Sequence, residues 1–222
     1  MEVKLMAYTP NPDYTCGLAA SVCTDYQGDP IKALRGALNS GHESVAEHAV
    51  FTFTISGVSR ALLAQLTRHR IASFSVQSQR YVYQGDQFEY VTPPKIMALG
   101  ENTALKYQIQ MRTIAAWYKE WVALLGGDEA AKEDARFVLP NACCTTLEMT
   151  MNARELLHFF SLRCCNRAQW EIRAMANEML QRCKEKAPVI FAHAGPGCVR
   201  GNCPEGAKSC KNQRKDLMAN GI

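Results

Sequence analysis

The stretch RHRIASFSVQSQRY, residues 68–81, concentrates more binding chemistry than any other part of this chain. Arg68, His69 and Arg70 stand together, seven residues separate Arg70 from Ser78, and Arg80 follows two positions later. Cationic side chains are costly to enclose unless a planar anion pairs with their hydrogen-bond donors. We therefore predict that these residues form a cradle for a phosphate and a nucleobase, and that the remaining chain folds into a compact host for it.

The length and composition of the chain suit such a host. It has 222 residues, of which 47% are hydrophobic and 21% charged, enough to bury one sizeable core. We expect a main domain over residues 1–193 and a separate Cys/Gly/Pro-rich tail over residues 194–222. No apolar run reaches the length of a membrane helix, and the first residues lack the pattern of a secretion signal. We thus expect a cytoplasmic protein, not bound to a membrane, whose ten cysteines are reduced.

The cationic residues are unevenly distributed. A net charge of +4 is too small by itself to indicate nucleic-acid binding. Between Arg60 and Arg182, however, eleven arginines accompany four lysines, whereas the two ends together carry three arginines and seven lysines. A rigid guanidinium fork suits phosphate and carbonyl oxygens better than a lysine point charge does. The central arginines therefore favour an oxyanion ligand, with surface ion pairs as the alternative.

Local patterns predict an α/β (α+β) fold in which helices flank a central mixed or antiparallel sheet. Branched and aromatic residues predict strands over 2–8, 49–55 and 143–150. The expected helix caps are Asp13, Asp29 and Asn152. Periodicity predicts helices over 13–26, 30–40, 59–66, 102–125, 128–137, 152–162 and 169–186. In the long helix 102–125 we expect a packing face made of Leu105, Ile109, Ile114, Trp117, Trp121 and Leu124.

Four separated sequence blocks together resemble the flavin-dependent thymidylate synthase family. The resemblance spans residues 42–171 and keeps the blocks in the family's order. The blocks are His42-Glu43-Ser44 with Glu47-His48, Arg68-His69-Arg70 with Ser78, Arg136 before Leu139-Pro140, and Asn152-Ala153-Arg154 with Leu162-Arg163 and Gln169-Trp170-Glu171.

The resemblance implies a homotetrameric α/β enzyme, with active sites at subunit interfaces, that methylates dUMP to dTMP. In this family FAD is the cofactor, 5,10-methylenetetrahydrofolate donates the carbon and NADPH is the reductant. The family uses no cysteine nucleophile, so it differs from the other class of thymidylate synthase.

Site residues follow from the resemblance by position. Arg163 would lie near the uracil and stabilise negative charge as C5 becomes nucleophilic, which makes it the expected catalytic residue. His42 resembles a histidine near the flavin and folate rings. The positions that match FAD contacts are Ser44, Arg68, His69, Arg70, Asn152, Arg154 and His158. The positions that match dUMP contacts are Gln65, Arg68, Gln77, Ser78, Gln79, Arg80, Arg136 and Arg163.

One position departs from the family's pattern. Many members carry Glu or Gln two residues before the motif serine, where this chain has Val76. Valine neither donates nor accepts a hydrogen bond, so Ser75, a backbone amide or water would have to replace such a contact.

Several residues admit structural interpretations. We expect His48 to be a buried histidine, and for His158 burial and ligand binding are both open. Ser78 lacks the strand-turn-helix elbow of a serine nucleophile, and Cys143 and Cys144 are expected to be packing thiols on a strand.

Two other functions remain open at this stage. The central arginines with nearby tyrosines also fit a nucleic-acid-binding module, although we expect no nucleic-acid partner. In the tail, Cys198, Cys203 and Cys210 with His193 could hold zinc in a regulatory protein, but their spacing lacks the paired steps of strong zinc motifs. Our expectation is therefore that no metal is bound.

Overall fold

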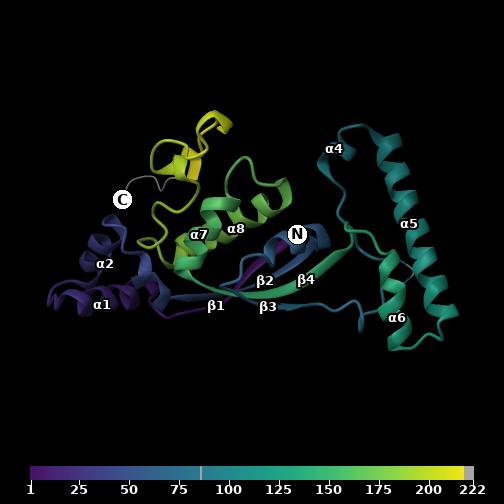
Figure 1. Ribbon diagram of the computed structural model, residues 1–222, viewed down its shortest axis with the longest axis horizontal. Coiled ribbons are helices and arrows are strands. Elements are labelled where there is room, and N and C mark those ends of the chain that lie inside the picture. The colour runs from purple at the N-terminus through teal and green to yellow at the C-terminus, as the bar shows by residue number, and fades with distance from the viewer. Residues whose placement is uncertain (86, 218–222) are drawn as a thin grey trace. The chain divides into compact units, whose positions relative to one another are not determined.

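The computed structural model describes residues 1–85 and 87–217 (Figure 1). Most predicted elements form close to their expected positions, and short 3-10 helices (η) are added in the loops. The elements are β1 (Glu2–Tyr8), α1 (Pro12–Thr24), α2 (Pro30–Asn39), η1 (Glu43–His48), β2 (Val50–Ser59), α3 (Arg60–Leu66), β3 (Ser73–Val76), α4 (Pro94–Met97), α5 (Glu101–Leu124), α6 (Glu129–Ala135), η2 (Arg136–Val138), β4 (Cys144–Asn152), α7 (Ala153–Arg163), α8 (Trp170–Lys186), η3 (Gly197–Val199), η4 (Gly206–Lys208) and η5 (Lys215–Leu217).

The strands form one four-stranded sheet in the order β1-β2-β4-β3. The end of β1 meets the start of β2, where the Thr9 N–H donates to the Val50 carbonyl at 3.0 Å. Between β2 and β4 the hydroxyls of Thr52 and Thr150 lie 2.9 Å apart, and the Arg60 N–H donates to the Cys143 carbonyl. Residue numbers thus rise along one strand as they fall along its neighbour, so both pairs are antiparallel. The predicted combination of helices with an antiparallel sheet is confirmed.

The chain divides into two compact units. The first, called the α5 unit, holds Met1–Glu2, Ile55–Gln65 and the described part of Ser75–Leu147. The second, called the α7 unit, holds Val3–Thr54, Leu66–Phe74 and the described residues from Glu148 onward. The division of the sequence at residue 194 into domain and tail stays a prediction.

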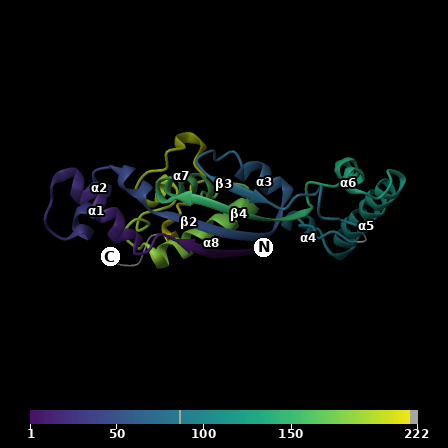
Figure 2. The same ribbon diagram turned by 90° about the horizontal axis from the view of Figure 1, so that it is seen from below.

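Aromatic packing forms the centre of the α7 unit. The ring of Phe51 on β2 meets Phe191 edge-on at 5.5 Å, and Phe191 meets Phe160 of α7 at 5.9 Å. Helices α7 and α8 lie on one face of the sheet (Figures 1 and 2). Since all three rings are fully buried, they anchor this helical layer on the sheet.

In the α5 unit, the long helix α5 packs through a face that the sequence analysis did not identify. Its buried residues are Met111, Ala115, Tyr118 and Val122, and Tyr118 and Val122 pack against α6. Most of the expected packing face is exposed instead, with Trp117 at 52% and Trp121 at 49% of their accessible surface, and Leu105, Ile109 and Leu124 also exposed. The expectation was wrong because α5 carries apolar residues on several faces, and periodicity cannot tell which one meets its own chain.

Asp13 does not cap α1 as expected. The helix begins at Pro12, after Asn11 in a left-handed conformation with φ 46°. Asp13 lies in the first turn, is buried, and accepts hydrogen bonds from the N–H groups of Val189 and Ile190 at 2.9 and 3.0 Å. The carboxylate therefore ties α1 to the chain beyond α8, whereas Asp29 and Asn152 cap α2 and α7 as predicted.

The described part of the expected tail packs within the α7 unit, with Ala194, Cys198 and Val199 buried. Arg214 reaches back from the tail: its Nη1 donates to the Cys164 carbonyl at 2.7 Å and its Nη2 to Asn177 Oδ1 at 3.4 Å. Polar contacts of one arginine thus supplement the few apolar residues of this segment. Within the described residues, no helix combines the length and apolar character needed to cross a membrane.

Replacing Asp13 with alanine should lower the free energy of unfolding by about 1–3 kcal/mol, because two backbone donors lose their buried acceptor. Chemical denaturation followed by circular dichroism measures this change. Glu185→Ala, which removes an exposed carboxylate from α8, is the control and should change stability by less than about 0.5 kcal/mol. Equal stability of the two variants would contradict this role of Asp13.

Candidate functional site

A line of three polar side chains forms the best-defined site in the α7 unit. The Nε of Arg163, at the end of α7, donates to His69 Nε2 at 3.0 Å. The other ring nitrogen, Nδ1, lies 3.3 Å from Glu155 Oε1. His69 is 6% and Glu155 8% exposed. The expected catalytic arginine is therefore connected through a buried imidazole to a buried carboxylate.

Local structure places the members of this line. The His69 N–H donates to the Leu66 carbonyl, which turns the chain after α3. Asn152 Oδ1 accepts from the Glu155 N–H at 2.8 Å and starts α7. On α7, Glu155 and Phe159 are buried while Arg154 and His158 are exposed, and Phe159 packs edge-on against the His69 ring at 4.9 Å.

Electrostatics favour a neutral imidazole. Burial lowers the pKa of His69, the cation of Arg163 and nearby His158 lower it further, and Glu155 acts in the opposite direction. Burial also lowers the pKa of Arg163, and Arg68 adds to this effect. Arginine nevertheless keeps its proton at any ordinary pH, so a neutral His69 can accept from it.

All residues expected to contact FAD lie in the α7 unit. Arg68, Arg70, Arg154 and His158 are exposed, as is Ser44 on η1, which packs against α7. Arg154 pairs with Glu47 of η1. Of this set only His69 is buried, and its ring nitrogens are both engaged by protein groups.

Most residues expected to contact dUMP lie in the α5 unit, namely Gln65, Gln77, Ser78, Gln79, Arg80 and Arg136. Two of the arginines share a partner: Arg80 Nε lies 2.8 Å from Glu133 Oε2, and Arg136 Nε donates to the Glu133 carbonyl at 3.1 Å. Ser78 Oγ accepts from the Arg80 N–H at 3.1 Å. Glu133 thus brings together Arg80 and Arg136, while Arg68 and Arg163 belong to the α7 unit.

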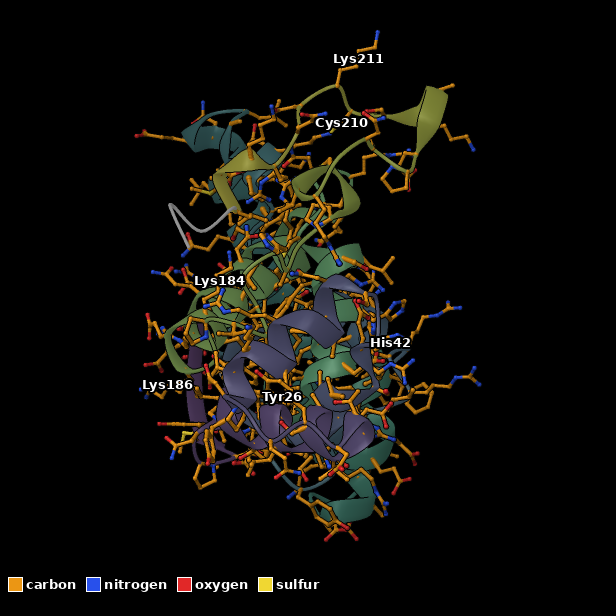
Figure 3. All side chains as sticks on the ribbon, turned by 90° about the vertical axis from the view of Figure 1, so that its left-hand side faces the viewer. Tyr26, His42, Lys184, Lys186, Cys210 and Lys211 are labelled. Carbon is orange, nitrogen blue, oxygen red and sulfur yellow. The ribbon has the colours of Figure 1, made fainter. Side chains whose placement is uncertain are left out.

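Two pockets of the α7 unit contain expected site residues. One, of about 510 Å³, is lined by Arg163, Arg167, Arg214 and the thiols of Cys198, Cys203 and Cys210. The other, of about 540 Å³, lies between α1, α2 and η1 and contains both His42 and Ser44. His42 and Tyr26 mark this second region in Figure 3, and Cys210 lies in the tail segment.

Burial makes two of the cysteines, Cys143 and Cys164, poor candidates for reactive thiols. All ten are free, as the sequence analysis predicts. Burial raises the pKa of Cys143, and it raises the pKa of Cys164 to about 12, so both remain thiols at neutral pH. In the part of the chain that the structure describes, no group of three His, Cys, Asp or Glu side chains could hold a metal ion.

Comparison with known proteins decides the family. The family model described as thymidylate synthase complementing protein matches residues 4–189. A flavin-dependent thymidylate synthase of Geobacter sulfurreducens is 49% identical over 95% of this chain and 94% of its own length. The chain belongs to the flavin-dependent thymidylate synthase family.

Other members of the family agree in sequence and in fold. The flavin-dependent thymidylate synthase of Clostridium tetani is 46% identical over 95% of this chain and 93% of its own length. A crystal structure of the flavin-dependent thymidylate synthase ThyX from Helicobacter pylori, complexed with FAD and dUMP, superposes with a TM-score of 0.67 at 25% identity. That alignment covers 88% of this chain and all of the other.

Three carboxylates that pair with predicted site residues were not predicted from the sequence: Glu47, Glu133 and Glu155. One signal was available, because Asn152 followed by Glu155 has the spacing of a capping box, in which the glutamate would bond back to the cap. Here the side chain of Glu155 instead reaches His69. The expectation of a buried His48 was wrong, since His48 is exposed at the end of η1.

Arg214→Ala should loosen the tail, because the Cys164 carbonyl and Asn177 lose their partner. We expect limited proteolysis within residues 200–217 to accelerate about tenfold or more, which corresponds to about 1.4 kcal/mol of local stability. Arg200→Ala is the control, since the side chain of Arg200 forms a 3.8 Å ion pair with Glu43, a type of contact worth about 0–1 kcal/mol. Equal cleavage rates in the two variants would show that Arg214 does not hold the tail.

Proposed function

We propose that this flavin-dependent thymidylate synthase binds FAD mainly through its α7 unit, with Arg163 acting on the uracil of dUMP. The observation that carries the proposal is the family match over residues 4–189 together with a relative solved with FAD and dUMP. The enzyme converts dUMP to dTMP, with 5,10-methylenetetrahydrofolate as carbon donor and NADPH as reductant.

The donor set supports flavin binding by the α7 unit. Arg68, Arg70, Arg154 and His158 present exposed donors, and the two phosphates of FAD offer many acceptor oxygens. Ser44 adds a hydroxyl and Asn152 a side-chain amide, and His42 lies in the same pocket as Ser44. FAD, when bound, supplies the hydride chemistry of the reaction, while these residues bind and orient it.

For dUMP, we assign the phosphate to Arg80 and Arg136 and the uracil base to Arg163. Arg80 pairs with the Glu133 carboxylate and Arg136 donates to the Glu133 backbone carbonyl. An arriving phosphate can replace these two acceptors as the partner of both guanidinium groups. We assign Ser78, Gln77, Gln79 and Gln65 to the same substrate. Arg163 then stabilises negative charge on the uracil oxygen as C5 attacks the one-carbon unit.

This mechanism needs no enzyme thiol. Cys143 is fully buried, and burial raises its thiol pKa, which removes the thiolate that nucleophilic attack requires. Many family members have Glu or Gln at the position of Val76. In this chain Ser75, a backbone amide or water would have to make the polar contact that those side chains make.

We also propose a homotetramer located in the cytoplasm. The exposed face of α5 carries Leu105, Ile109, Trp117, Trp121 and Leu124, and a run of large apolar side chains on one helix is typical of an interface with another subunit. The ten free thiols suit a reducing compartment.

The assay that tests the function compares NADPH oxidation with and without dUMP and methylenetetrahydrofolate. We expect Arg163→Ala to retain flavin and to lower kcat about 100-fold, because a donor aimed at transition-state charge contributes on the order of 3 kcal/mol. Cys143→Ala is the control and should keep the wild-type kcat. Full activity of Arg163→Ala would contradict its catalytic role, and a colourless protein that binds oligonucleotides with steep salt dependence would contradict the enzyme assignment.

The assembly is tested on the exposed face of α5. Trp117→Glu should shift the protein from tetramer to smaller species in sedimentation velocity, because a buried, unpaired charge at an interface costs several kcal/mol. Val22→Glu places the same charge at another exposed apolar side chain, on α1, and should leave the assembly unchanged. An unaltered tetramer in Trp117→Glu would place the interface elsewhere.

A further inference from the structure

The hydrogen-bonded line from Glu155 through His69 to Arg163 is buried, and direct contact of His69 with a ligand does not explain it. Both ring nitrogens of His69 are engaged by protein groups, at 3.0 Å from Arg163 Nε and 3.3 Å from Glu155 Oε1. A ligand that used either nitrogen would have to break one of these contacts.

We infer that Glu155, acting through His69, is a positioning residue that aims the Arg163 guanidinium at the substrate. The inference rests on the proposed function, in which Arg163 acts on the uracil. It assigns to Glu155 a role in the reaction and to His69 the role of a link between two residues of α7.

The proton inventory allows only one arrangement of this line. The Nε of arginine is always a donor, so His69 Nε2 must be the unprotonated nitrogen. A neutral imidazole then carries its proton on Nδ1, which donates to the Glu155 carboxylate. A carboxylate at this position therefore selects the tautomer that can accept from Arg163.

The arrangement also determines which hydrogen-bond donors of Arg163 remain available to a ligand. Nε is used by His69, and neither Nη group donates to any residue within the described parts of the chain. Arg163 lines the pocket of about 510 Å³. One internal hydrogen bond thus restrains the direction of the Nε–H group and leaves both Nη groups for a ligand in that pocket.

Helix capping does not account for the buried charge. The contact that caps α7 uses the backbone N–H of Glu155, not its carboxylate, so a smaller apolar side chain would cap equally well. The groups that face His69 are Glu155, Arg163 and His158 of α7, together with the ring of Phe159, while Arg68 is its neighbour in sequence. Among these, Glu155 alone carries negative charge.

The test is a double-mutant cycle between Glu155→Ala and Arg163→Ala, measured as kcat with dUMP on flavin-loaded protein. We expect Glu155→Ala alone to lower kcat about 10–100-fold, as misplacement of a catalytic group does. Combined with Arg163→Ala it should cause almost no further loss, because residues that act as a unit are not additive. Losses that multiply in the double variant would overturn the inference.

Glu155→Gln provides a second test if the alanine variant does not fold. Glutamine keeps an acceptor oxygen, so kcat at neutral pH should fall only a few-fold. Glu155 raises the pKa of His69, so its removal lowers that pKa, and the acidic limb of the kcat profile should move to lower pH. An acidic limb that stays in place would overturn the inference.

The matched control is Asp13→Ala, which removes another buried carboxylate of the α7 unit, one that accepts hydrogen bonds from two backbone N–H groups. It should lose stability while keeping the wild-type kcat and acidic limb. Equal kcat losses in Asp13→Ala and Glu155→Ala would show a merely structural effect and overturn the inference. A wild-type protein without dUMP-dependent activity would refute the proposed function and this inference with it. If the wild type is active but the kcat losses of Glu155→Ala and Arg163→Ala multiply in the double variant, the inference alone is refuted.

Discussion

A buried carboxylate needs a hydrogen-bond donor. The hydrogen bond between Glu155 and His69 is the contact on which the arrangement of the site in the α7 unit depends. Its partner is a histidine from the 66–74 segment, far away in sequence, so the same contact ties that segment to α7. Because His69 is held by burial and by Glu155, its second nitrogen is free to hold an arginine. One buried charge therefore determines where the segment lies, which tautomer the imidazole adopts and how Arg163 is held.

The C-terminal end of α7, which carries Arg163, also receives a contact from the tail. Arg214 donates to the carbonyl of Cys164, the residue immediately after Arg163. Burial leaves the neighbouring Cys164 and Cys183 as inert thiols, and their contribution is packing. These cysteines therefore contribute packing next to Arg163, and they do not act as nucleophiles.

Helix α5 buries one face within its own chain and leaves another exposed. A narrow face with Tyr118 and Val122 packs against α6 within the chain, while the larger tryptophans remain exposed. Large aromatic side chains bury much area for little conformational entropy, so they are effective where subunits meet. The exposed tryptophans of α5 are therefore the basis of the proposed subunit interface.

Much of the fold followed from local patterns: the strand at 2–8, the caps at Asp29 and Asn152, and the limits of α7 and α8 each depend on neighbours a few residues away. The cationic motif, the family and the expected catalytic arginine were also readable from residue identity and spacing. The sequence could not show that Asp13 would serve Val189 and Ile190, that α5 would bury its narrow face, or that Glu155 would bond His69. Those outcomes depend on which distant groups meet in three dimensions, and a buried donor or acceptor takes the partner that packing brings within reach rather than the one nearest in the chain.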